Sequence, residues 1–339
     1  MQKKKQTVVI ADYDYGNVDI ERAIVEGAGL ELVAAQCKSE DDVIDVARDA
    51  DAIIAQYATI GAKAINAFTR CRVIARYGTG VDIVDVDAAT RRNILVTNVP
   101  NDWCENEVAD HAMALLLAVA RRLRDYDRAT RAGVWRWQSG QPIYRLRGRM
   151  LGLLSFGAIA QAIAARAAGF GMRVIASDPY KTPADIAANG ATSVSFDELI
   201  EQADYLVIQA PLTSQTRHLI DEARLRRMKP GAILVNTARG PIVNDRALYR
   251  ALKEGWIAGA GLDDIEEEPA KVRDWKPTNP LFGLENVIIT PHAAYYSEEA
   301  IRTVRDFAAQ EVVRVLTGKP PLSPVNAAQF ATANPTRSA

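Results

Sequence analysis

The stretch RMLGLLSFGAIAQAIAARAAGFGMRVIASDP (149–179) contains a short apolar strand, a turn at Gly157, an alanine-rich helix and a second apolar strand. This order is typical of a βαβ unit that binds a dinucleotide, because the helix N-terminus meets the pyrophosphate. The usual fingerprint, G-x-G-x-x-G, is altered, since Ser155 and Ala160 stand at the positions of the first and third glycines. Gly157, where the backbone approaches the phosphates most closely, is intact, so the unit still predicts a nucleotide site.

Ser155 and Asp178 decide how such a site would work. A positive φ at Ser155 would cost about 1 kcal/mol or slightly more, whereas a β-region backbone would cost little. Asp178 ends the second strand, where a carboxylate accepts hydrogen bonds from ribose hydroxyls and repels a 2′-phosphate. The unit therefore favours NAD over NADP. The alternative is a structural βαβ unit in which Asp178 caps a helix.

Apolar strands alternate with helical patterns along the whole chain, whose 339 residues suggest two domains. This alternation indicates parallel sheets covered by helices on both faces. Besides the strand that opens the βαβ unit, the expected strands are 7–12, 31–35, 51–56, 72–76, 93–98, 172–178, 203–210, 232–238, 257–263 and 286–290.

A long helical pattern over 101–133 connects the two sets of strands. Asn101 and Asp102 are candidate caps at its start, and Gly133 is a candidate stop at its end. We expect one connecting helix here, and a further amphipathic helix over 297–318. About the last fifteen residues of the chain are expected to be loosely ordered.

The composition excludes several classes of partner. A net charge of −1 and a pI of about 6.4 argue against nucleic acid and anionic membranes, and Lys3–Lys5 reads as a solvated tail. We expect neither a signal peptide nor a membrane span. Cys37, Cys71 and Cys104 have no C-x-x-C spacing, which argues against disulfides and zinc and predicts a cytoplasmic protein without metal.

The chain has three histidines that could carry acid–base chemistry. His111 lies within an apolar helical pattern and is expected to be packed. His218 follows a strand and a turn and could cap or pack. His292 directly follows the expected strand 286–290, and a histidine at a strand end is well placed for proton transfer near neutral pH.

Charged side chains follow two neighbouring strands. Arg239 comes directly after strand 232–238, where it can hold a carboxylate through two parallel hydrogen bonds. Asp263 ends the next strand, and Glu266–Glu268 precede Pro269. This acidic run could be a solvated loop, or one of its carboxylates could orient a histidine and keep it protonated. Because ligands bind at the carboxyl ends of strands in open α/β sheets, we expect these groups to lie together.

These motifs occur in an order that resembles the D-isomer-specific 2-hydroxyacid dehydrogenases over about residues 50–320. The matching segments are the nucleotide unit, QAPLTSQTRHLID, MKPGAILVNTARGPIVNDRAL, GAGLDDIEEEP and NVIITPHAA. RYGTGVDIVDVDAATRRNILVTNVP (76–100) is similar to the family's substrate-domain loop. PHAAYYSEEA and Arg76 most resemble the C-terminal-binding protein branch, in which Tyr295 falls where the animal members usually have tryptophan.

The resemblance implies two Rossmann-like or flavodoxin-like doubly wound parallel-sheet domains with a cleft between them. An NAD domain (102–292) would be inserted into a discontinuous substrate domain (1–101 and 293–339). It further implies a homodimer through the helical region 105–131. The expected activity is hydride transfer between NADH and the C2 carbonyl of a 2-oxo acid.

The resemblance also implies residue roles. Arg239 would bind the substrate carboxylate, His292 would exchange the proton, and Glu268 would pair with His292. Substrate contacts would be Arg76, Gly78, Thr79, Gly80 and Tyr295. The nucleotide contacts would be Thr79, Val108, Ser155, Gly157, Ala158, Ile159, Ala160, Asp178, Ala210, Pro211, Leu212, Thr216, Thr237, Ala238, Arg239, Asp263, His292 and Ala294.

Two other functions remain open at this point. The protein could be an NAD(H)-responsive, corepressor-like regulator with little turnover, and the catalytic residues do not exclude this because the closest branch keeps them. It could also be a βα scaffold that has lost its cofactor, which Gly157 and Asp178 argue against.

Overall fold

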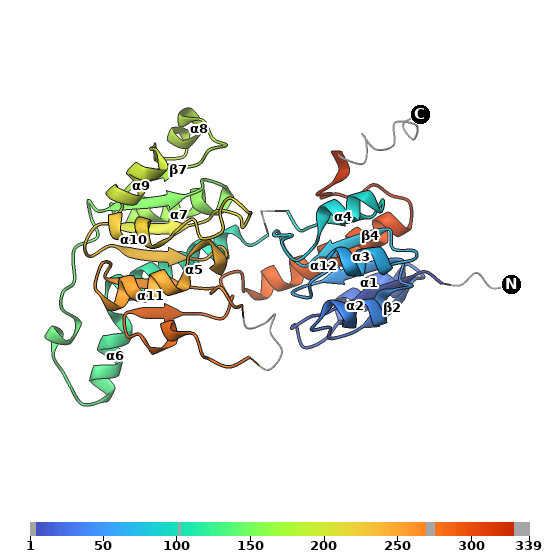
Figure 1. Ribbon diagram of the computed structural model, residues 1–339, viewed down its shortest axis with the longest axis horizontal. Helices are drawn as coiled ribbons and strands as arrows, with labels where there is room; N and C mark the ends of the chain where they lie inside the picture. The colour runs from blue at the N-terminus through green and yellow to red at the C-terminus, as the bar shows by residue number, and fades with distance from the viewer. Residues whose placement is uncertain (1–4, 101–102, 269–274, 329–339) are drawn as a thin grey trace. The chain divides into compact units, whose positions relative to one another are not determined.

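The computed structural model describes residues 5–100, 103–268 and 275–328 (Figure 1). The chain divides into two compact units. The first contains the chain up to Trp103 and from Ser297 onward, and the second contains most of the chain between them. The expected caps Asn101 and Asp102, and the end of the tail, lie outside the described residues.

A five-stranded parallel sheet forms the centre of the first unit, in the order β2-β1-β3-β4-β5. Successive residues of each strand face opposite sides, so Val8 packs with α1 and α12, while Val9 packs with α2, α3 and α4. The strands are β1 (Thr7–Ile10), β2 (Glu31–Ala34), β3 (Ala52–Ala55), β4 (Val73–Arg76) and β5 (Leu95–Thr97). The helices are α1 (Asp19–Gly27), α2 (Glu40–Ala47), α3 (Ala62–Ala67), α4 (Val86–Arg91) and α12 (Glu298–Leu316).

A seven-stranded parallel sheet, in the order β12-β11-β10-β9-β6-β7-β8, forms the centre of the second unit. Helices α5 and α7 cover one face, and α9, α10 and α11 cover the other. The strands are β6 (Met150–Leu154), β7 (Arg173–Ser177), β8 (Thr192–Ser193), β9 (Tyr205–Ile208), β10 (Ile233–Asn236), β11 (Gly259–Leu262) and β12 (Val287–Ile289). The helices are α5 (Glu105–Ala120), α6 (Leu123–Arg131), α7 (Ala158–Gly169), α8 (Pro183–Ala188), α9 (Phe196–Gln202), α10 (Glu222–Arg227) and α11 (Asp245–Lys253), with 3₁₀ turns η1 (Trp137–Gly140), η2 (Gly240–Ile242) and η4 (Pro280–Gly283).

The two parallel α/β sheets confirm the predicted fold class, and every expected strand is present. Strand β8 was not expected from the sequence, because it has only two residues and pairs with β7 at the sheet edge. The expected helix 297–318 is α12, and Ser297 caps it by accepting a hydrogen bond from the Ala300 N–H at 3.0 Å. Among the described residues, no helix is long and apolar enough to span a membrane.

The prediction of a single helix over 105–131 is wrong. The segment forms two helices, α5 and α6, which are separated at Arg122, whose φ is 53°. Helix α5 buries an apolar stripe that ends at Val119 and Ala120. None of the residues of α6, all of them described, is buried. After α5 there is therefore no buried face that holds the chain in the direction of the α5 axis. Figure 1 shows α6 projecting beyond the β12 end of its sheet.

Candidate active site

The nucleotide unit is built from the loops that follow β6 and β7. Gly157 is the N-cap of α7, and a Cβ added there would meet no described atom within 4 Å. This open space lies at the N-terminus of a twelve-residue helix, whose first N–H groups and dipole suit a pyrophosphate. Ala160 is fully buried, so it packs the helix against the sheet as the third fingerprint position requires.

Ser155 adopts φ 75°, so the fingerprint serine occupies the conformation that favours glycine. Its hydroxyl donates to Oδ2 of Asp178 at 3.1 Å. The same oxygen accepts the Phe156 N–H at 2.8 Å, and Oδ1 accepts the Tyr180 N–H at 2.8 Å. Asp178 thus ties the loops after β6 and β7 together. It does not cap α8, whose N-cap is Thr182.

The other expected nucleotide contacts follow β9 and β10. Thr216 donates to the Pro211 carbonyl at 2.6 Å, which closes the loop after β9 on itself. Thr237 accepts a hydrogen bond from the Gln209 amide at 2.6 Å and so links that loop to the end of β10. Because β6, β7, β9 and β10 are parallel neighbours, these loops lie at one edge of the sheet.

His292 and Glu268 form a histidine–carboxylate pair in the second unit. The Nδ1 atom of His292 lies at hydrogen-bond distance from Oε1 of Glu268. The Glu268 side chain is 6% exposed and the His292 side chain 17%, so the pair is shielded while the imidazole keeps some access. The Tyr295 ring meets the imidazole edge-on, with ring centroids 5.8 Å apart.

Asp263 holds the turn that presents His292. Its carboxylate accepts the N–H groups of Ala293 at 2.9 Å and Ala294 at 2.8 Å, and its carbonyl accepts the His292 N–H at 2.7 Å. His292 itself has φ 54°, a conformation that these bonds stabilise. His111 is half-buried on α5 and hydrogen-bonds Thr290 at 2.9 Å, which is the packed position expected for it.

The acidic run divides between two histidines. Glu266 pairs with His218 through Nε2, and Glu268 pairs with His292, while Glu267 is exposed. The two pairs are therefore separate, and only the Glu268–His292 pair includes a residue of the turn after β12. The sequence alone left open which carboxylate, if any, would face His292.

Arg239 directly follows the residues that close β10. Its Nη1 donates to the Ala238 carbonyl at 2.8 Å, and its own carbonyl accepts the Asn236 side-chain amide at 2.9 Å. Gly240, the next residue, donates its N–H to Oδ2 of Asp264 at 3.0 Å. The Arg239 loop and the loop after β11 are thereby joined, and one carboxylate oxygen each of Asp264 and Glu268 and a ring nitrogen of His292 lie within 4.8 Å of one another.

Sequence reasoning did not single out Asp264. The only signal was the doubled aspartate in GLDDIEEEP, of which only the first was assigned a role. Asp264 is 6% exposed. Burial raises its pKa to about 6, and the Glu268 carboxylate adds to this, while His292, the Gly240 N–H and Arg239 lower it.

The expected substrate loop belongs to the first unit. Arg76 is buried at the end of β4, and its Nη1 donates to the Tyr77 carbonyl. Gly78 has φ 126°, a conformation that favours glycine, and a Cβ there would lie 1.8 Å from Nη1 of Arg76, so a side chain would also displace the arginine tip. Thr79 is fixed by Trp103, whose indole N–H donates to its hydroxyl at 3.0 Å, and by the Asn98 amide, which donates to its carbonyl at 2.7 Å.

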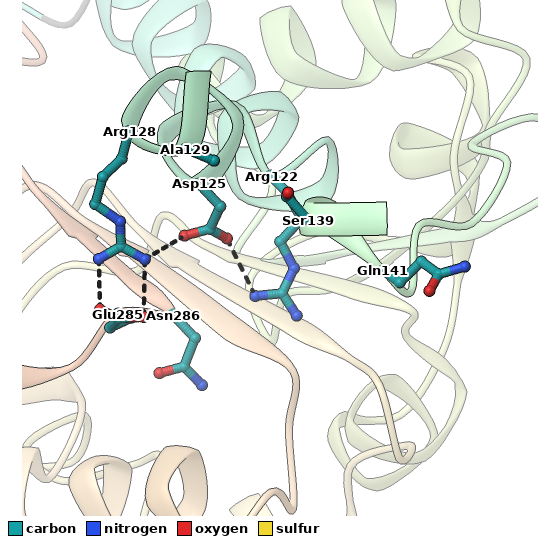
Figure 2. Close-up of a pocket in the computed structure, with 8 residues that line it drawn as sticks. All are labelled: Arg122, Asp125, Arg128, Ala129, Ser139, Gln141, Glu285 and Asn286. Carbon is teal, nitrogen blue, oxygen red and sulfur yellow. Dashed lines mark hydrogen bonds and ion pairs between the residues drawn. The ribbon is translucent and has the colours of Figure 1, made fainter. Parts of the chain in front are cut away.

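A polar cavity of about 460 Å³ lies beside α6 and contains none of the expected site residues. Figure 2 shows Arg128 directed toward both Glu285 and Asp125, with Arg122 reaching Asp125 from the other side. The charges that line it therefore pair with one another. The lining residues are Arg122, Asp125, Arg128, Ala129, Ser139, Gln141, Glu285 and Asn286.

Comparison with known proteins places this chain in a family. Residues 113–294, more than half of the chain, match the model of the D-isomer specific 2-hydroxyacid dehydrogenase NAD binding domain. A glyoxylate reductase from Korarchaeum cryptofilum is 41% identical over 292 residues, which cover 85% of this chain and 86% of the relative. The solved D-lactate dehydrogenase from Aquifex aeolicus, in complex with NAD and lactic acid, is 27% identical with a TM-score of 0.84, covering 92% of this chain and 96% of that one.

The chain therefore belongs to the D-isomer specific 2-hydroxyacid dehydrogenase family. A D-3-phosphoglycerate dehydrogenase from Mycobacterium leprae is also 39% identical over 274 residues, which cover 80% of this chain and 50% of the relative. These findings confirm an NAD-dependent oxidoreductase that acts on a 2-oxo or 2-hydroxy acid. The closer resemblance to the C-terminal-binding protein branch stays a prediction.

Proposed function

We propose that the protein reduces the C2 carbonyl of a small 2-oxo acid with NADH and gives a D-2-hydroxy acid, with His292 as the proton donor. The observation that carries this proposal is the shielded Glu268–His292 pair on the turn after β12. A histidine oriented by a buried carboxylate suits general acid–base catalysis near neutral pH. The glyoxylate reductase relative supports glyoxylate as the first substrate to test.

Three side chains divide the chemistry between them. Arg239 binds the substrate carboxylate through its planar guanidinium and polarises the neighbouring carbonyl. Glu268 engages Nδ1 of His292, so Nε2 is the nitrogen that gives a proton to the carbonyl oxygen and recovers it in the oxidation direction. NADH would supply the hydride when it is bound.

The cofactor contacts are assigned to the sheet edge described above. The N-terminus of α7, including Ala158 and Ile159, would hold the pyrophosphate, and the open space at Gly157 fits this group. Asp178 would accept the ribose hydroxyls and oppose a 2′-phosphate, so we expect NADH to be preferred over NADPH. Residues 102–292 would thus form the nucleotide domain, and residues 1–101 with 293–339 the substrate domain.

We also propose that the protein is a homodimer that associates through the region of α6. Exposed aromatic side chains support this, since Trp135 is 88% exposed, Trp137 66% and Tyr144 55%. Large apolar side chains left in water in one segment are typical of protein interfaces. The three described cysteines are buried and form no disulfide, which supports a reducing, cytoplasmic location.

The experiment is NADH oxidation, followed by absorbance, against a panel of 2-oxo acids with NADPH as a second cofactor. We expect turnover with glyoxylate or another short 2-oxo acid. His292→Asn should lower kcat by about 10²- to 10⁴-fold and leave NADH binding, measured by fluorescence, unchanged. His218→Asn is the matched control, because it breaks the other histidine–glutamate pair of the same unit.

Two outcomes would contradict the proposal. Equal turnover of the His292→Asn and His218→Asn variants would remove His292 from the proton transfer. NADH binding without turnover of any 2-oxo acid would favour the NAD(H)-responsive regulatory protein instead.

A further inference from the structure

Asp264 is a buried carboxylate to which the proposed function assigns no role. It lies directly after Asp263 and four residues before Glu268, in the loop that follows β11. Oδ1 accepts the Ile265 N–H at 2.8 Å, and Oδ2 accepts the Gly240 N–H at 3.0 Å. The second bond joins two loops that different strands supply.

Gly240 shows how closely these loops approach. A Cβ at Gly240 would lie 2.0 Å from the Ile265 carbonyl oxygen, so no side chain fits between the two backbones. The Asp264 carboxylate makes the hydrogen bond across this contact, and Arg239 is the residue directly before the glycine. The position of the Arg239 backbone therefore depends on the side chain of Asp264.

Charged groups from four elements surround Asp264. Glu268 comes from its own loop, Arg239 from the end of β10, His292 from the turn after β12 and Asp245 from the first turn of α11. With Glu268 and His292, Asp264 completes a group whose oxygen and nitrogen atoms lie within 4.8 Å of one another. Two buried carboxylates thus face one imidazole.

Burial of a carboxylate costs free energy unless the charge serves a function or is compensated by hydrogen bonds and opposite charges. An apolar residue or asparagine at position 264 would avoid this cost, and asparagine could still accept the Gly240 N–H. Besides a second acceptor, which Ile265 uses, what aspartate supplies is the second negative charge near His292. A negative charge at this distance favours the protonated imidazole.

We propose that Asp264 is a positioning residue of the acid–base site, which fixes the Arg239 loop through Gly240 and adds a second carboxylate to the Glu268–His292 pair. This inference rests on the function proposed above. Burial raises the pKa of Asp264 to about 6, so its charge develops as the pH rises through the weakly acidic range. Above that range Asp264 adds its negative charge to the site, and below it Asp264 is neutral.

The test compares Asp264→Asn with the wild-type protein and with Asp245→Asn. Asp245 is the control for a second buried carboxylate, because burial raises its pKa to about 6 as well, and although its charge acts on Asp264 it hydrogen-bonds Glu266 and Asn279 and not Gly240. In Asp264→Asn we expect the basic limb of the pH profile of kcat/KM for 2-oxo acid reduction to move about 1 unit lower. Asp245→Asn should move this limb by less than Asp264→Asn does.

A second readout does not depend on turnover. The chain has only three histidines, so the His292 ring signal can be identified in NMR spectra by its loss in His292→Asn. Its chemical shift at a fixed neutral pH should differ between Asp264→Asn and the wild type, even if no 2-oxo acid is turned over, which separates failure of this inference from failure of the proposed function. Asp264→Ala, which also removes the acceptor for Gly240, should raise KM for the 2-oxo acid further than Asp264→Asn does. A wild-type limb together with a wild-type His292 chemical shift in Asp264→Asn would overturn the inference.

Discussion

The hydroxyl of Ser155 donates to the same Asp178 oxygen that accepts the Phe156 N–H, at 3.1 and 2.8 Å. Ser155, the residue that alters the fingerprint, is therefore hydrogen-bonded to the carboxylate that we propose binds the ribose hydroxyls. The bond also helps to hold serine at φ 75°, which serine otherwise adopts rarely. The serine at the first glycine position thus links the loop after β6 to the carboxylate that we propose binds the ribose.

Ser155→Gly should tighten NADH binding by about 2- to 5-fold. The substitution removes one hydrogen bond to Asp178 and leaves an oxygen lone pair for a ribose hydroxyl, which is a gain of less than about 1 kcal/mol. Fluorescence titration with NADH measures the change. Weaker binding in Ser155→Gly would show that the hydroxyl contacts the cofactor instead.

Asp178→Asn should lower the preference for NADH over NADPH by at least about tenfold. The asparagine oxygen can still accept one of the two loop N–H groups, which bond to different oxygens of Asp178, but the negative charge that opposes a 2′-phosphate is lost. The measurement is the ratio of kcat/KM for the two cofactors with one 2-oxo acid. An unchanged ratio would mean that another group sets the cofactor preference.

Arg305→Met should destabilise the first unit by about 3 to 5 kcal/mol. Arg305 on α12 donates to both oxygens of Glu21, at 2.9 and 2.7 Å, and Tyr77 donates to Glu21 at 2.9 Å, all within the buried interior. The substitution leaves the Glu21 carboxylate buried without its counterion. Thermal and urea unfolding measure the loss.

The matched variant for this ion pair removes both charges. Glu21→Leu combined with Arg305→Met should be less destabilised than Arg305→Met alone, because apolar side chains carry no desolvation penalty. A double variant at least as unstable as the single one would show that the hydrogen bonds outweigh that penalty.

Asp245→Asn should change the pH dependence of stability. Burial raises the pKa of Asp245 from an ordinary value of 3.8 to about 6, so its favourable contribution is complete below pH 3.8 and lost as the pH rises through 6. The ionised carboxylate then costs roughly 3 kcal/mol. Relative to the wild type, Asp245→Asn should gain about this much free energy of unfolding between pH 4 and pH 8. If the free energies of unfolding of the two proteins changed with pH in parallel, the pKa of Asp245 would not be raised to about 6.

The sheets were predictable because their strands are short, apolar and separated by clear helical patterns. Strand β8 and the break at Arg122 were not predictable in the same way. Two residues make too short a pattern for a strand, and helical spacing continues through Arg122 although burial ends at Ala120. Local periodicity describes which residues can share a face, and tertiary packing decides whether that face is used.

The candidate site was predictable where chemistry and strand ends coincide. The pairing of Glu268 with His292 agrees with the role implied by the family resemblance, although catalysis by these residues stays a prediction. The contributions of Asp264 and of the Arg305–Glu21 pair could not be predicted from the sequence. The first depends on a close backbone approach at Gly240, and the second joins residues 284 positions apart, so neither leaves a local pattern.

The division of the first unit between the two ends of the chain has a consequence for biosynthesis. Val304, Ala308 and Val312 of α12 complete the hydrophobic core around Val8 and Ile10, so the N-terminal strands cannot close that core until the C-terminal helix exists. About 190 residues of the second unit are translated in between, which takes roughly 10 to 40 s at ordinary ribosome speeds. During that interval α1 covers only part of this apolar face, and chaperones are expected to engage the part that α12 covers later.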